Sequence, residues 1–212
     1  KPFLKKLLGF IVICFGPFLI LLLGGYLYFD PFKVLYNYNI TSQQANKLPF
    51  IYKNRDYVST ELFIKNYPRY KYNAFIFGSS RSLSFQPDSW KKHLQQQDVP
   101  FAFDAGAESV YGIYTKLKYL DEKKVKIDKA LIILCRDWSF QHDGNHRGHL
   151  FIKDPAVSGE SKLLFQYEFL DAYLDKNFLK AFYNYKLTHK FKKWMTGILL
   201  DKEIVTDSIS NA

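Results

Sequence analysis

The chain has 212 residues, of which 48% are hydrophobic and 18% aromatic. Such a composition excludes an intrinsically disordered protein, because burying so many rings is strongly favourable. The 30 Lys and Arg residues outnumber the 20 Asp and Glu residues and give a net charge of +10. Since the basic residues are dispersed and form no compact basic run, we expect a membrane surface or a glycan as partner and no nucleic acid.

The first feature along the chain is an uncharged run of 23 residues at 7–29. A helix of that length rises about 1.5 Å per residue and matches the ~30 Å hydrocarbon layer of a bilayer. The run predicts a transmembrane helix, with the lipid bilayer as a partner. A cleaved signal peptide is the alternative, but its apolar region is shorter and ends in small residues, whereas this run ends in the bulky residues 26–29.

Three lysines in the segment 1–6 precede the apolar run, and the next basic residue is Lys33. Because positively charged flanks stay in the cytoplasm, this asymmetry predicts a cytoplasmic N-terminal tip. The expected location is the bacterial inner membrane, crossed once, with the remaining domain in the periplasm.

After the run, residues 30–72 read as a connector with one short helix at 59–66, and residues 201–212 read as a polar tail. Between them, 73–200 predicts one α/β domain in which short apolar strands alternate with helices, the pattern of a parallel sheet with right-handed crossovers. The expected strands are 74–77, 101–103 and 130–135, and the expected helices are 87–97, 109–124 and 160–195.

The segment Phe75–Ser82 (FIFGSSRS) is the most informative stretch for chemistry. A buried strand that runs through Gly78 into two serines and a helix presents a hydroxyl at the sheet edge. The glycine permits a tight turn, and the N–H groups that follow face an anion. This arrangement suits Ser80 as a nucleophile beside an oxyanion site. The alternative is that the serines only cap a helix.

The same segment resembles the first block of the SGNH (GDSL-like) hydrolase superfamily, in its membrane-anchored branch that modifies bacterial surface polysaccharides. Gly78 and Ser80 match that block, while Ser79 replaces its acidic residue. Asp104-Ala105-Gly106 resembles the second block, which implies the Gly106 N–H as an oxyanion donor. The third block is matched only by Asp137, without its asparagine. The expected oxyanion or substrate residues are therefore Gly106, Asp137 and Arg81.

The superfamily also carries a C-terminal Asp-x-x-His, which supplies the base and the residue that orients it, and no such spacing occurs in 150–212. One match lies earlier, at Asp143 and His146. The two intervening residues, Gly144 and Asn145, favour a loose turn. We therefore expect His146 to lie beyond hydrogen-bond distance of Ser80, and keep Asp143 and His146 as the candidate pair should that expectation fail.

These histidines belong to the loop 142–149, which holds three histidines and an aspartate and leaves three interpretations open. It supplies a catalytic base, it contacts a substrate as a polar loop, or it binds a divalent metal. The third is disfavoured because metal ligands need a rigid spacing. Cys14 and Cys135 fall in separate apolar segments and do not pair. We expect no metal and no cofactor.

The resemblance implies a flavodoxin-like, three-layer α/β domain that follows the transmembrane helix. Its implied activity is acyl (acetyl) transfer to a cell-surface glycan, or ester hydrolysis on it, with a membrane-bound O-acyltransferase or another envelope protein as partner. A different class also fits: a non-catalytic, membrane-anchored binding or assembly subunit that keeps the fold without a triad. A third interpretation is that the chain is a fragment and its C-terminal strands and catalytic pair lie outside it.

Overall fold

The computed structural model describes residues 2–36, 49–137, 139–140, 148–202 and 207–211. The chain divides into two compact units, Lys1–Tyr38 and Asn39–Ala212. Each unit is described by itself.

The first unit consists mainly of helix α1 (Pro2–Phe29), which carries Pro17 inside it. The apolar stretch of its sequence is interrupted by Gly16-Pro17 and by Gly24-Gly25. Among the described residues, no helix combines the length and the apolar character needed to cross a membrane. This finding corrects the predicted transmembrane helix at 7–29, and the single-pass inner-membrane location that followed from it is not supported.

The second unit is built on a three-stranded parallel sheet in the order β2-β1-β3, and this confirms the predicted parallel α/β arrangement. The strands are β1 (Ala74–Gly78), β2 (Pro100–Ala102) and β3 (Lys129–Ile133). Each lies within two residues of its predicted position. β1 is the central strand and is buried along its whole length, as a continuous apolar run requires.

Helices α2, α4, α5, α6 and α7 begin at side chains that accept backbone N–H groups, such as Asn54 for α2 and Ser109 for α4, whereas α3 begins without such a cap. The predicted helix at 160–195 is two helices, because Asp175 ends the first and caps the second. The helical elements are α2 (Arg55–Tyr70), η1 (Ser80–Ser84), α3 (Pro87–Lys91), α4 (Val110–Glu122), α5 (Pro155–Ser158), α6 (Lys162–Leu174), α7 (Lys176–Thr188) and η2 (Lys193–Met195).

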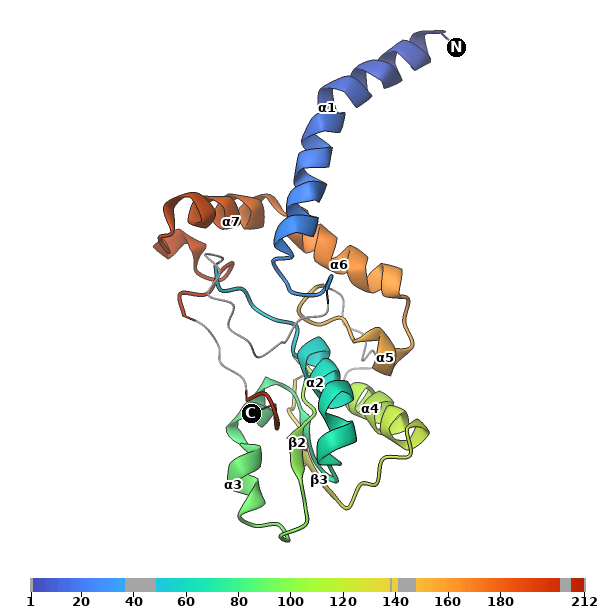
Figure 1. Cartoon of the computed structure of the whole chain (residues 1–212), viewed down its shortest axis with the longest axis vertical. Coiled ribbons are helices and arrows are strands. Elements are labelled where there is room, and N and C mark those ends of the chain that lie inside the picture. The colour runs from blue at the N-terminus through green and yellow to red at the C-terminus, as the bar shows by residue number, and fades with distance from the viewer. Residues whose placement is uncertain (1, 37–48, 138, 141–147, 203–206, 212) are drawn as a thin grey trace. The chain divides into compact units, whose positions relative to one another are not determined.

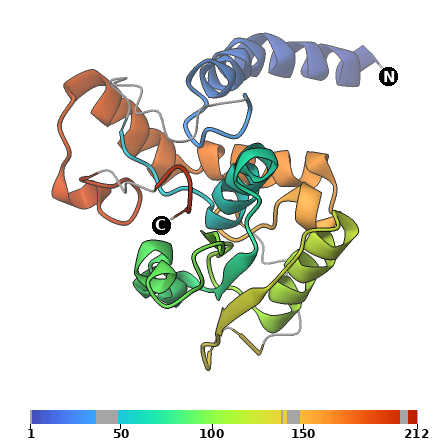
Figure 2. The same ribbon diagram turned by 60° about the horizontal axis from the view of Figure 1, so that its bottom comes forward.

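Helix α2 belongs to the core, which corrects the interpretation of residues 30–72 as a connector. Its Phe63 stacks on Phe103 at a centroid distance of 5.4 Å and contacts Phe75 and Phe101. Aromatic pairs of this kind contribute about 0.5–1.5 kcal/mol each beyond the area they bury. Figure 1 shows α2 and α4 beside the sheet, and the turned view in Figure 2 shows α3 on the opposite flank from α4.

The C-terminal residues 207–211 also pack against the sheet, which corrects the predicted polar tail. The Ala102 N–H donates to the Ser210 carbonyl at 2.9 Å, so this segment continues the hydrogen bonding along β2. Asn211 is fully buried, and Tyr72 Oη donates to the Ile209 carbonyl at 2.5 Å. These bonds fix the chain end at the outer side of β2.

Candidate active site

The site begins at Gly78, where β1 ends against β3. A Cβ atom at this position would lie 2.9 Å from the Ile133 carbonyl oxygen and 3.1 Å from Ser82 Cβ. Only glycine allows the two strand ends and the following turn to approach this closely. The chain then places Ser79 inside, at 2% exposure, and Ser80 on the surface.

The residues after Ser79 form the short 3-10 turn η1, and α3 follows at Pro87, at the start of the predicted helix 87–97. Both the N–H and the Oγ of Ser82 donate to the Ser79 carbonyl, each at 2.8 Å. Ser79 occupies the N-cap position, but its side chain makes no capping hydrogen bond. A single 3-10 turn provides little macrodipole, so any anion bound here depends on individual N–H groups and not on a helix end.

The neighbouring turn follows β2 and contains Asp104. The Asp104 carboxylate is completely buried, and Arg55 binds both of its oxygens, with Nε–Oδ2 and Nη2–Oδ1 distances of 2.9 Å. The Ala105 N–H donates to the Gly78 carbonyl at 3.2 Å. That hydrogen bond joins the turns after β1 and β2, as expected for neighbouring parallel strands whose carboxyl ends share one edge.

Gly106 is the next residue, and its surroundings are tight. A Cβ atom here would lie 3.3 Å from both the Leu150 carbonyl oxygen and the Phe151 ring. Within the described part of the chain, neither the Ser80 N–H nor the Gly106 N–H donates a hydrogen bond. Two joined turns therefore carry backbone N–H groups for which the described residues provide no acceptor.

The other predicted site residues that the structure describes have a position on the chain but no hydrogen bond with Ser80. Arg81 is exposed on η1, and Asp137 is exposed after β3. Asp143 and His146 lie outside the described residues, so the expectation that His146 is remote from Ser80 stays a prediction. Of the same loop, His149 is described: burial lowers the pKa of its imidazole, and its ring meets Phe169 edge-on at 6.1 Å.

Sequence reasoning missed a buried ionic cluster beneath this edge, formed by Asp56, Glu108, Lys116 and Lys153. All four side chains are at most 1% exposed. Burial alone would raise the pKa of Asp56, but the ammonium groups of Lys116 and Lys153 outweigh it and hold that pKa below its usual value. Burial likewise opposes the charge of Lys116, while Asp56 and Glu108 raise its pKa well above the ordinary value.

No sequence signal could have revealed this cluster, because its members come from separate elements and share no spacing motif. In the described ranges, no group of three or more His, Cys, Asp or Glu side chains is arranged to hold a metal ion.

Comparisons with known protein families, curated proteins and solved structures found no match for this chain. The geometry of these residues is therefore the basis for assigning a function.

Proposed function

We propose that the chain carries a serine-dependent acyltransferase or esterase site with Ser80 as its nucleophile. The observation that carries this proposal is the pairing of an exposed Ser80 with two N–H groups, at Ser80 and Gly106, for which the described residues provide no acceptor, on turns joined by the Ala105–Gly78 hydrogen bond. Two backbone donors directed at one oxygen are what a tetrahedral acyl intermediate requires. The resemblance of FIFGSSRS to the SGNH nucleophile block supports the same assignment.

The chemistry is a two-step acyl transfer. Ser80 Oγ attacks the carbonyl carbon of an ester, its proton passes to a base directly or through one water, and the N–H groups of Ser80 and Gly106 hold the oxyanion. The alcohol leaves with a proton, and the acyl group remains on Ser80. Attack by water then completes hydrolysis, whereas attack by an acceptor hydroxyl completes transfer.

The proposed acceptor is a glycan hydroxyl. The net charge of +10 and exposed aromatic rings such as Tyr111 and Tyr114 suit an anionic or sugar-rich surface. Leu83 and Phe85 expose 39% and 46% of their area just after Ser80, where apolar side chains favour contact with an acyl group.

A second candidate is a non-catalytic binding or assembly subunit with the same fold. This alternative is favoured by the surroundings of Ser80, because none of the described residues forms a hydrogen bond with its hydroxyl. A serine nucleophile works only when a base takes its proton.

The experiment is active-site labelling of the full chain with a fluorophosphonate, together with hydrolysis of p-nitrophenyl acetate. Ser80→Ala should abolish labelling and lower hydrolysis roughly a thousandfold. Ser79→Ala and Ser84→Ala, in the same turn, should each change the rate by less than about threefold, because neither is the nucleophile. Labelling that persists in Ser80→Ala contradicts the proposal, and a wild-type chain that neither labels nor hydrolyses supports the binding subunit.

A further inference from the structure

The buried ionic cluster joins four separate parts of the second unit beneath the candidate site. Lys116 Nζ lies 3.0 Å from Asp56 Oδ2 and 2.9 Å from Glu108 Oε2, and Lys153 Nζ contacts the same two carboxylates. Its two positive and two negative charges cancel. Replacing such a cluster by apolar residues of equal volume is often neutral or stabilising, so stability alone does not account for it.

Lys116 also reaches beyond the carboxylates to the backbone of the turn after β2. Its Nζ donates to the Asp104 carbonyl at 2.8 Å and to the Phe103 carbonyl at 3.3 Å. Ser59 Oγ, which is also fully buried, donates to the same Asp104 carbonyl at 2.8 Å. The ammonium and the hydroxyl together satisfy this one carbonyl oxygen.

That carbonyl belongs to the same peptide unit as the Ala105 N–H, which donates to the Gly78 carbonyl at 3.2 Å. The Asp104–Ala105 peptide plane is thus held at both ends, by Lys116 on one side and by Gly78 on the other. Because peptide units are rigid and planar, fixing this plane anchors the start of the turn, and only the φ and ψ angles of Ala105 then set the direction of the next N–H, that of Gly106.

Lys153 extends the same cluster to the segment that covers Gly106. The next residue, Asp154, donates its N–H to Asp56 Oδ1 at 2.8 Å. Asn54 Nδ2 donates to the Ile152 carbonyl at 2.8 Å, and this segment places Leu150 and Phe151 against Gly106. The ionic cluster therefore holds both the turn after β2 and the segment 150–154 that packs against Gly106.

We propose that Lys116 is the positioning residue of the site: its buried ammonium fixes the Asp104–Ala105 peptide and thereby aims the Gly106 N–H at the acyl oxygen. This role rests on the proposed function of Ser80. Lys116 itself touches no reacting atom, and it acts through the turn after β2.

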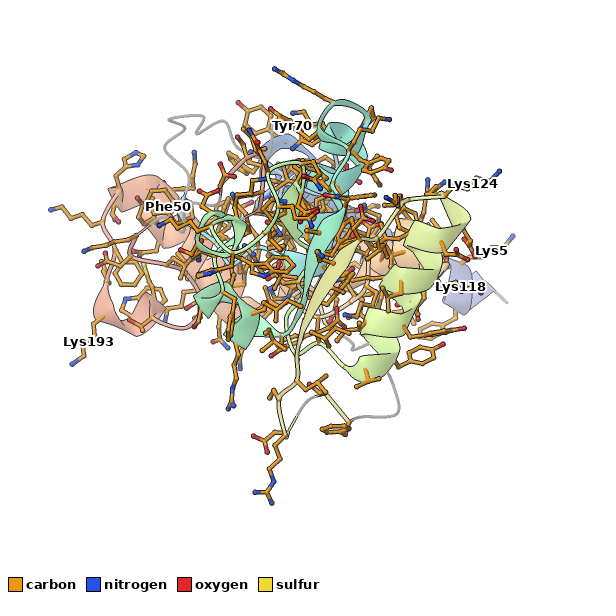
Figure 3. The ribbon with its side chains drawn as sticks, turned by 90° about the horizontal axis from the view of Figure 1, so that it is seen from below. Lys5, Phe50, Tyr70, Lys118, Lys124 and Lys193 are labelled. Atoms are coloured by element: carbon orange, nitrogen blue, oxygen red, sulfur yellow. The ribbon has the colours of Figure 1, made fainter. Side chains whose placement is uncertain are left out.

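The test combines hydrogen exchange of the Ala105 amide with the fluorophosphonate labelling rate of Ser80 in the full chain. Lys116→Met should raise Ala105 exchange at least about tenfold and slow labelling about tenfold, while exchange in α7 stays unchanged. Ser59→Ala removes the second donor with little change in volume, and should keep the fold and shift both readouts in the same direction by a smaller factor. Lys118→Met is the matched control, since Lys118 lies on the same helix with 62% of its side chain exposed (Figure 3).

The two measurements separate the two proposals. If Ala105 exchange in both variants equals that of Lys118→Met, the positioning role is wrong whatever the chemistry of Ser80. If exchange rises while labelling of Ser80 is unchanged, the turn is held by Lys116 but does not serve the reaction, and the role is equally wrong. A wild-type chain that no probe labels contradicts the proposed function, while the exchange comparison still decides whether Lys116 holds the turn.

Discussion

Arg55 and Asp104 form a bidentate ion pair between the first turn of α2 and the turn after β2, with both N–O distances at 2.9 Å. The carboxylate is fully buried, whereas 18% of the arginine side chain is exposed. Because a buried carboxylate needs its partners, this pair fixes the entry of α2 relative to the sheet edge that carries Ser80.

Arg55→Met should therefore lower the free energy of unfolding by about 3–5 kcal/mol, since it leaves Asp104 buried without its cation. Arg55→Lys keeps the positive charge but not the planar group that binds both carboxylate oxygens. This variant should lower the free energy of unfolding by about half as much. The measurement is urea unfolding followed by circular dichroism. Arg69→Met, an exposed arginine of the same helix, is the control; a similar loss in both variants would show that the ion pair is unimportant.

A second prediction concerns Gly112 in the first turn of α4. Gly→Ala inside a helix ordinarily stabilises by up to about 1 kcal/mol. At this position a Cβ atom would overlap the Glu108 carboxylate and lie 3.1 Å from Lys153 Nζ, so the buried cluster occupies the space that a side chain would need.

Gly112→Ala should consequently destabilise the second unit by about 1–3 kcal/mol, opposite in sign to the helix propensity. Gly24→Ala in α1, with nothing within 4 Å of the added Cβ, provides a helical control and should be neutral or slightly stabilising. Thermal unfolding of the two variants against wild type decides the sign. A stabilised Gly112→Ala chain would mean that the Glu108 carboxylate does not lie over α4.

The strands could be predicted because their information is local. Phe75, Ile76 and Phe77 form an unbroken apolar run that ends at a glycine, and such runs are typical of buried parallel strands. The edge position of Ser80 followed from the same pattern. The turn geometry did not, because whether a chain enters an α-helix or a 3-10 turn depends on contacts such as that between Gly78 and Ile133.

The rest of the site could not be predicted because its contacts are distant in sequence. Lys153 and Asp56 are 97 residues apart, and Asn211 and Asp104 are 107 apart. Charged residues are ordinarily on the surface, so nothing in the sequence marks Lys116 as buried. For the apolar run at 7–29, in contrast, the sequence predicted a feature that the structure does not support. Hydrophobic composition alone predicted a membrane span, and no described helix has the length and apolar character to cross a membrane.

The C-terminal segment offers a test of charge at the sheet edge. Asn211 Nδ2 donates to the Ala102 carbonyl at 2.6 Å and to Asp104 Oδ1 at 2.9 Å, and the residue is fully buried. Asn211→Ala loses these bonds and should destabilise by about 1–3 kcal/mol. Asn211→Asp has nearly the same shape but places a second carboxylate against Asp104, and should be less stable than Asn211→Ala at neutral pH.

The difference between the two variants should shrink as the pH falls, because protonation of the introduced carboxyl removes the repulsion. Urea unfolding at neutral pH and near pH 4 is the measurement. If Asn211→Asp equals wild type at neutral pH, the segment 207–211 does not pack on Asp104.

The last prediction concerns Asp154, whose carboxyl caps α5 by accepting the Ala156 N–H at 2.7 Å. Burial, reinforced by the carboxylates of Asp56 and Glu61, raises its pKa to about 7, although the Ala156 N–H and Lys116 act in the other direction. In the unfolded chain an Asp titrates near pH 3.9. Between about pH 4 and pH 7 the folded state therefore holds a proton that the unfolded state has released, so the free energy of unfolding falls as the pH rises.

Asn cannot ionise and still accepts the Ala156 N–H. The free energy of unfolding of Asp154→Asn should therefore not fall in this way as the pH rises. Relative to wild type, its free energy of unfolding should rise progressively between about pH 4.5 and 7.5, by about 2–4 kcal/mol in total, and level off above that range. Asp128→Asn is a control of opposite sign: hydrogen bonds from Asn73 and Lys126 lower the pKa of that exposed carboxyl. The ionised Asp128 carboxyl stabilises the folded state at neutral pH, and this stabilisation disappears as the pH falls through that lowered pKa. A pH-independent difference between Asp154→Asn and wild type would show that Asp154 is not buried beside Asp56.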